Sequence, residues 1–197
     1  MASTHDYIAD KRNKDILIYI NGEFFHRSDA KISVFDSGFL LGDGVWEGIR
    51  LHKNSLIHFN QHINRLYAGA DAIAMKIQLN KNELKDAVRL TLEKNAMHSD
   101  THIRLIVSRG IKSTPYQHPK VTIGDPTIVI IPEYKKPNSE VFDIGIRLAS
   151  VKTKRDNMVQ DPKINSSLPT TSRVLHYLFV AVSKITAPLD GGHHLCY

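Results

Sequence analysis

Apolar side chains recur along the chain with two periods, and the order of these periods predicts the fold class. The apolar run at residues 16–20 is followed by Asn21-Gly22 and a second run of β-formers. This pattern is typical of a β-hairpin, because both positions of its tight turn need a positive φ. The strands that the chain predicts span residues 16–20, 23–25, 45–51, 55–58, 101–108, 127–134 and 144–151.

Two helices are expected between the fourth and fifth strands. Asn60 is a candidate N-cap for the first, and the apolar residues that follow it recur at helical spacing. Asn80 begins the second helix, with Glu83 at the position that completes a capping box. Strands, two helices and more strands, with no internal repeat, favour an α+β two-layer sandwich over a doubly wound sheet.

The glycines at positions 38, 42, 44 and 48 form the densest glycine run of the chain. Their spacing matches neither the P-loop nor the dinucleotide-binding fingerprint. We interpret them as bends and bulges in a β-rich region.

Arg104 interrupts an otherwise apolar strand. An unpaired buried guanidinium is very unfavourable, so this side chain must either form a salt bridge or reach a cleft. From the residues alone, a structural ion pair and an anion-binding role both stay open.

Composition narrows the function classes. The formal charge is +6, but the basic residues are scattered and lack interleaved aromatic residues, so we expect an anionic small molecule as ligand and no nucleic acid. Eleven histidines and Cys196 form no pattern of a zinc site, and we expect no metal. We also expect no membrane span and no signal peptide. With Cys196 as the only cysteine, no disulfide can form within the chain, and we expect a cytoplasmic protein.

Five motifs in a fixed order carry a family resemblance. They are Asn21-Gly22, Phe35-Asp36-Ser37-Gly38-Phe39, residues 42–50 (GDGVWEGIR) with His62-Ile63-Asn64-Arg65-Leu66, residues 102–110 (HIRLIVSRG), and Asp161-Pro162-Lys163-Ile164-Asn165-Ser166. Together they resemble the class IV aminotransferases, which are fold type IV enzymes that use pyridoxal 5'-phosphate (PLP).

The resemblance implies a role for particular residues. Lys163 would bind PLP covalently and move a proton during transamination, and Arg65 would bind the cofactor phosphate. Trp46 would wall the substrate pocket, and Arg104 would lie near the substrate carboxylate. Tyr116 stands in the loop where D-amino-acid transaminases carry a carboxylate-binding residue, so a D-specific enzyme is not favoured.

The resemblance also implies an arrangement of domains. Residues 1–140 would form the small N-terminal domain, residues 141–166 the start of the PLP-binding domain, and residues 167–197 a tail that does not match. The acidic residue facing the pyridine nitrogen has no counterpart in this tail, and the chain looks truncated. We therefore expect it to bind PLP poorly and to turn over no amino acid.

The function that this implies is a PLP-dependent transaminase. It would transfer the amino group of a small, branched-chain amino acid to 2-oxoglutarate, and the full-length family would form homodimers. Three alternatives remain: a D-amino-acid transaminase, an aminodeoxychorismate lyase, and a catalytically inactive remnant that acts as a subunit or interaction module.

Overall fold

The first hairpin forms where the Asn-Gly pair predicts it in the computed structural model, which describes residues 9–136. Strands β1 (Leu17–Ile20) and β2 (Glu23–His26) pair antiparallel. The turn between them has Asn21 at φ 48° and Gly22 at φ 100°. These are the positive values that the turn requires and that glycine adopts without a steric penalty.

The hairpin belongs to a six-stranded sheet with the order β2-β1-β6-β5-β3-β4. Its other strands are β3 (Gly44–His52), β4 (Ser55–Leu56), β5 (Thr101–Ser108) and β6 (Thr127–Tyr134). Every pairing is antiparallel. The described part of the chain is therefore α+β, as the sequence predicts.

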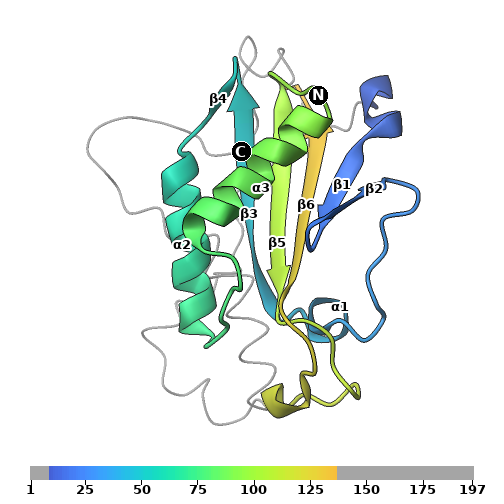
Figure 1. Cartoon of the computed structure of the whole chain (residues 1–197), viewed down its shortest axis with the longest axis vertical. Helices are drawn as coiled ribbons and strands as arrows, with labels where there is room; N and C mark the ends of the chain where they lie inside the picture. The colour runs from blue at the N-terminus through green and yellow to red at the C-terminus, as the bar shows by residue number, and fades with distance from the viewer. Residues whose placement is uncertain (1–8, 137–197) are drawn as a thin grey trace, which may run out of the picture.

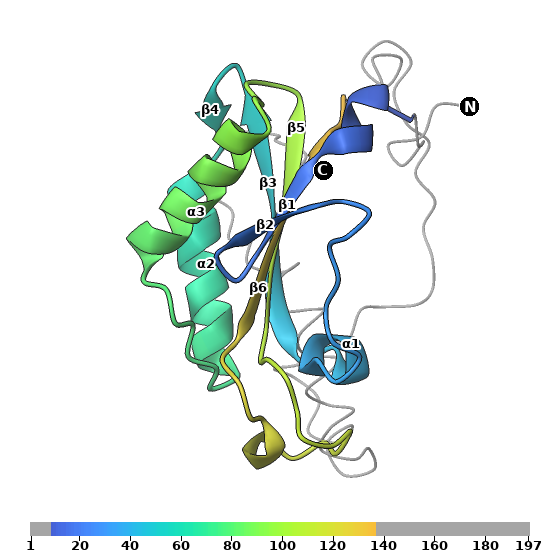
Figure 2. The ribbon, with the colours of Figure 1, turned by 45° about the vertical axis from the view of Figure 1, so that its right-hand side comes forward.

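Two helices cover one face of this sheet. They are α2 (Phe59–Ala72) and α3 (Lys81–Lys94), and Figures 1 and 2 show both on the same side, with α2 beside β3. The capping box predicted at the start of α3 is present, with Asn80 accepting from Glu83 N and Glu83 accepting from Asn80 N. The core lies between helices and sheet, and its fully buried members include Ile49, Ile63, Leu84, Val88, Ile103, Leu105 and Ile130.

Alternation along β3 assigns its side chains to two different environments. Val45, Glu47 and Ile49 are buried, whereas Trp46 between them is only partly buried. Successive side chains of a strand point to opposite faces. Glu47 therefore faces the helices together with the apolar core, and Trp46 belongs to the other face.

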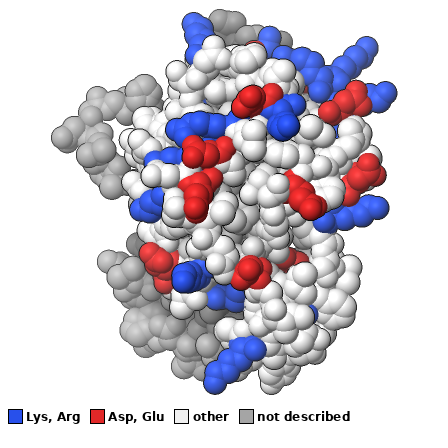
Figure 3. All heavy atoms as spheres, in the orientation of Figure 1, with Lys and Arg blue, Asp and Glu red and all other residues white. Residues whose placement is uncertain are grey.

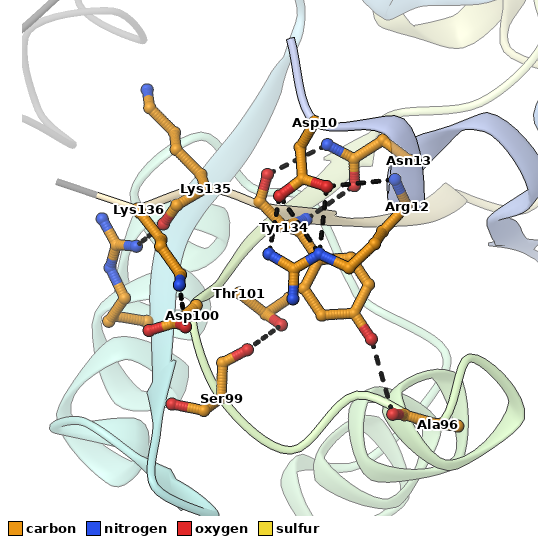
Figure 4. A network of polar contacts seen from close by, with 11 residues as sticks. Asp10, Arg12, Asn13, Ala96, Ser99, Asp100, Thr101, Tyr134, Lys135 and Lys136 are labelled. Carbon is orange, nitrogen blue, oxygen red and sulfur yellow. Dashed lines mark hydrogen bonds and ion pairs between the residues drawn. The ribbon is translucent and has the colours of Figure 1, made fainter. Parts of the chain in front are cut away.

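A short 3₁₀ helix, η1 (Lys11–Asp15), fastens the start of the described chain to the end of β6. Asn13 Nδ2 donates to the carbonyl of Tyr134 (2.9 Å), and Tyr134 N donates to Asn13 Oδ1 (2.7 Å). The Arg12 guanidinium lies 3.8 Å from the centroid of the Tyr134 ring and pairs with Asp10 at 2.6 Å (Figure 4). The side chain of Asn13 thus continues the hydrogen bonding of the sheet.

Three features differ from the sequence prediction. Strand β4 ends at Leu56, two residues before the predicted end at His58. The glycine run begins with a helical turn, α1 (Ser37–Leu41), capped by Asp36 and ended by Gly42 in the left-handed region at φ 66°. Helix α2 begins at Phe59, not after Asn60, because His58 adopts a left-handed conformation and ends the preceding loop. The strand predicted at residues 144–151 lies outside the described residues.

Candidate active site

A buried carboxylate joins β3 to α2. Glu47 Oε1 accepts from Arg65 Nε at 2.6 Å, and Glu47 Oε2 accepts from Arg65 Nη2 at 2.5 Å. His62 Nδ1 lies 2.8 Å from the same Oε2. Because His62 and Arg65 are three residues apart on α2, both can reach one point on the sheet.

The Glu47 carboxylate is charged in this setting. Its side chain is 1% exposed, and this burial by itself would raise its pKa. The hydrogen bonds from Arg65 and His62 outweigh burial, and the pKa of Glu47 lies below its ordinary value. Arg65 therefore sits in a two-pronged ion pair, while 23% of its own side chain remains exposed.

Trp46 and Arg104 meet on the opposite face of the sheet. The Arg104 guanidinium carbon lies 4.2 Å from the centroid of the Trp46 ring, a cation–π contact. Arg104 is exposed, and no carboxylate among residues 9–136 lies within ion-pair distance of it. Two roles for Arg104 were left open, a structural salt bridge and anion binding. Within residues 9–136, Arg104 forms no such salt bridge.

An apolar cavity of about 430 Å³ lies beside Trp46 on this face. It is lined by the outer-face residues of four strands, by α1 and by the segment before α1, including Ile18, Ile32, Phe39, Trp46, Ile106, Val129 and Ile131. Such a volume suits a small molecule with an apolar side chain. Figure 2 shows α1 and the segment before it on the side of the sheet away from α2 and α3.

Strand β3 carries one residue of each group, Trp46 and Glu47. Within the described residues, β4 pairs with β3 only at Leu51 and His52, which leaves residues 44–49 without a strand on their outer side. Glu47, which binds Arg65, directly follows Trp46 in this strand. A ligand lying against this edge could therefore contact side chains from both faces.

The remaining predicted site residues are not joined to these two groups. Tyr116 lies in the loop between β5 and β6, is 65% exposed and is absent from the lining of the cavity. Lys163 lies outside the described residues. Arg109, which follows the strand that carries Arg104, has a structural role: it pairs with Asp43 at 2.7 Å and donates to the carbonyls at the end of α2.

Glu47 is the residue of this site that sequence reasoning missed. Its signal was available, because an acidic residue stands at an inward position of a strand between Val45 and Ile49. A carboxylate at such a position requires a cationic partner. The identity of that partner depends on the packing of α2 against β3 and so follows only from the fold.

The charges, the possible metal ligands and the helices of residues 9–136 add three observations. Basic and acidic side chains are interspersed on the face that α3 covers, as Figure 3 shows, and do not form a continuous basic band there. Within this range, no three histidine, cysteine or acidic side chains cluster as metal ligands would, and no helix is long and apolar enough to cross a membrane.

The relatives found by comparison with known proteins bear the names of aminotransferases. A Methanocaldococcus jannaschii protein that bears the name of a branched-chain-amino-acid aminotransferase is 38% identical over 175 residues, which are 88% of this chain and 56% of that protein. D-alanine aminotransferase of Listeria monocytogenes is 33% identical over 51% of this chain and 34% of its own. The solved branched-chain amino acid aminotransferase of Escherichia coli matches with a TM-score of 0.54 and 25% identity, over 61% of this chain and 40% of that one.

This chain thus spans little more than half of the first relative and less of the others. The fold of residues 9–136 agrees with the small α/β sandwich expected of fold type IV enzymes, since the structural match covers a similar share of the chain. The family model for amino-transferase class IV matches residues 44–181, most of the chain. The chain belongs to the class IV aminotransferase family.

Proposed function

We propose that this chain is part of a PLP-dependent transaminase that moves the amino group of a small, branched-chain amino acid to 2-oxoglutarate. The observation that carries the proposal is the edge of β3. There, a guanidinium suited to phosphate lies on one face, and an aromatic-walled apolar cavity lies on the other. In this proposal residues 1–140 are the N-terminal domain, and residues 141–166 begin the domain that completes the cofactor site.

The chemistry of Arg65 fits a cofactor phosphate. A guanidinium binds phosphate through two parallel N–H groups, and Arg65 combines partial exposure with an orientation fixed by Glu47. When bound, PLP supplies an electron sink for the negative charge that develops at the substrate Cα. Lys163 would hold the cofactor and move the proton of that Cα.

Trp46 and Arg104 would orient the substrate. The cavity beside Trp46 offers apolar surface to a branched side chain. Arg104 stacks on the same ring and presents a cation that a carboxylate can pair with. A branched-chain amino acid and a dicarboxylic oxo acid would use these two features in turn. The substrate-binding role of Tyr116 stays a prediction from the resemblance.

An assay of amino donors tests this proposal against its two enzymatic alternatives. Leucine, isoleucine, valine, D-alanine and aminodeoxychorismate are each offered with 2-oxoglutarate and PLP. We expect glutamate to form from the branched-chain donors, if the protein tested contains the complete site. Turnover of D-alanine alone, or pyruvate release from aminodeoxychorismate without glutamate, would refute the proposal.

A non-catalytic interaction module remains the second candidate, favoured by the apolar surface around α1. Val34, Phe39 and Ile123 are each at least 65% exposed. Large apolar side chains exposed together are typical of a surface that another molecule covers. This candidate predicts self-association of the 197-residue chain together with weak PLP binding. Sedimentation that shows a monomer at high concentration would count against it.

Covalent capture separates the two candidates. The chain is mixed with PLP, dialysed, reduced with borohydride and mapped by mass spectrometry. Stoichiometric labelling of Lys163 that survives dialysis would support an assembled cofactor site in the 197 residues. Traces of label spread over many lysines would support the non-catalytic module.

A further inference from the structure

Glu47 occupies a position where a carboxylate is unfavourable for packing alone. It is completely buried on the helix side of β3, between Val45 and Ile49, whose side chains belong to the core. Replacement of buried ion pairs by apolar residues of similar size is often neutral or stabilising. The charge at this position therefore calls for a role other than holding β3 against α2.

We propose that Glu47 is a positioning residue that fixes the guanidinium of Arg65 for a phosphate group. This inference rests on the proposed function, because it assigns the phosphate of PLP as the ligand of Arg65. Glu47 engages the edge of the guanidinium formed by Nε and Nη2. The guanidinium is planar, so binding along one edge fixes the direction of the whole group.

His62 supports the carboxylate in the same arrangement. Its Nδ1 lies 2.8 Å from Glu47 Oε2, the oxygen that also accepts from Arg65 Nη2. The carboxylate is thus held from two positions of α2 and cannot rotate without breaking both contacts. Arg65 remains partly exposed, and an arginine at such a position without a partner would sample many rotamers.

The charge of Glu47 opposes phosphate binding, and this effect must be weighed against the positional one. The carboxylate repels a phosphate beyond Arg65, but water at the partly exposed guanidinium screens this repulsion. If the guanidinium of Arg65 loses its fixed direction, its two-pronged contact with the phosphate is lost. We therefore expect removal of Glu47 to weaken phosphate binding.

The test compares PLP with pyridoxal, which has no phosphate. Binding of each to the 197-residue chain is followed by quenching of Trp46, the only tryptophan. Wild type should prefer PLP, and Arg65→Gln should abolish the preference. Glu47→Gln should reduce it about tenfold, equal to about 1.4 kcal/mol, with little change for pyridoxal. Glu47→Asp keeps the charge but moves the carboxylate away from Arg65, because the side chain is one methylene shorter. This variant should also reduce the preference for PLP.

Asp43→Asn is the matched control. Asp43 and Arg109 form a second two-pronged ion pair with little exposure among residues 9–136, with 11% and 13% of their side chains exposed. Loss of this ion pair in Asp43→Asn should destabilise the fold about as much as Glu47→Gln does, and it should leave the preference for PLP over pyridoxal unchanged. The effect of Glu47→Gln should persist at about 1 M salt, where screening of charges is strongest.

The outcomes separate failure of this inference from failure of the proposed function. If wild type does not distinguish PLP from pyridoxal, the phosphate role of Arg65 is wrong and the inference falls with it. If Arg65→Gln abolishes the preference and Glu47→Gln leaves it intact or increases it, only the positioning role is overturned. Equal losses in Glu47→Gln and Asp43→Asn would also overturn it, because they would reveal a general effect of stability.

Discussion

Replacement of Asp36, whose carboxylate is buried, should destabilise this fold more than most single substitutions. It is 1% exposed and accepts three hydrogen bonds: from Gly38 N at 2.8 Å, Ser108 Oγ at 2.8 Å and Thr127 Oγ1 at 2.7 Å. These contacts join the N-terminus of α1 to β5 and β6. One side chain thus connects three segments that are distant in sequence.

The expected effect of Asp36→Ala follows from these contacts. Loss of an N-cap destabilises by about 1 kcal/mol, and each hydrogen bond to a charged group contributes about 1.5–3 kcal/mol. Relief from burying the carboxylate offsets part of this sum. We expect a net loss of about 3 kcal/mol in the free energy of unfolding.

Urea denaturation followed by Trp46 fluorescence measures this loss. With a slope of about 2 kcal/mol per molar urea, the midpoint should fall by about 1.5 M. A double-mutant cycle with Thr127→Val should give a coupling of about 1–2 kcal/mol, because the two side chains touch. A loss below about 1 kcal/mol with no coupling would refute the role of Asp36 as a connecting residue.

Three further predictions concern the backbone, pH and substrate binding. Gly110→Ala should lower the free energy of unfolding in urea by about 2 kcal/mol more than Gly22→Ala. Both glycines have φ near 100°, but only at Gly110 would a Cβ lie 2.2 Å from a backbone oxygen. Equal losses in the two variants would contradict this reasoning. Burial and neighbouring cations lower the pKa of His102 to about 4 from 6.5. The free energy of unfolding should therefore be greatest above pH 6.5 and fall by up to about 2 kcal/mol as the pH drops to 4. In His102→Gln, the same pH series of denaturation curves should lack this contribution. In the complete enzyme, Arg104→Gln should weaken binding of 2-oxoglutarate about tenfold in calorimetry, because the cation beside Trp46 is lost. Binding of an uncharged apolar ligand should change less, and equal weakening of both would count against a carboxylate role.

Most of the fold could be predicted because its local signals agree with its packing. The strands at residues 101–108 and 127–134 have the predicted bounds. Their alternating or continuous apolar runs end at residues that break strands. Helix α1 was missed because five residues are too few to display a helical period.

The candidate site was predicted less completely, for a physical reason. Trp46, Arg65 and Arg104 came from motifs, and the roles of Tyr116 and Lys163 stay predictions. Glu47 contacts a residue 18 positions further along the chain and on another element. No periodicity within one element contains that pairing, since it exists only when α2 packs on β3.

The position of β1 in the sheet has a consequence for how this chain folds during synthesis. Tyr19 and Ile20 pair with Ile130 and Val129, about 110 residues later. Strand β1 therefore has to wait for β6 to leave the ribosome before it can join the sheet, while the β3, α2, α3 and β5 segments can already assemble. Contacts this distant in sequence slow folding, because a long loop must close before they form. The hairpin of β1 and β2 should accordingly be the last part of the described sheet to gain protection from hydrogen exchange.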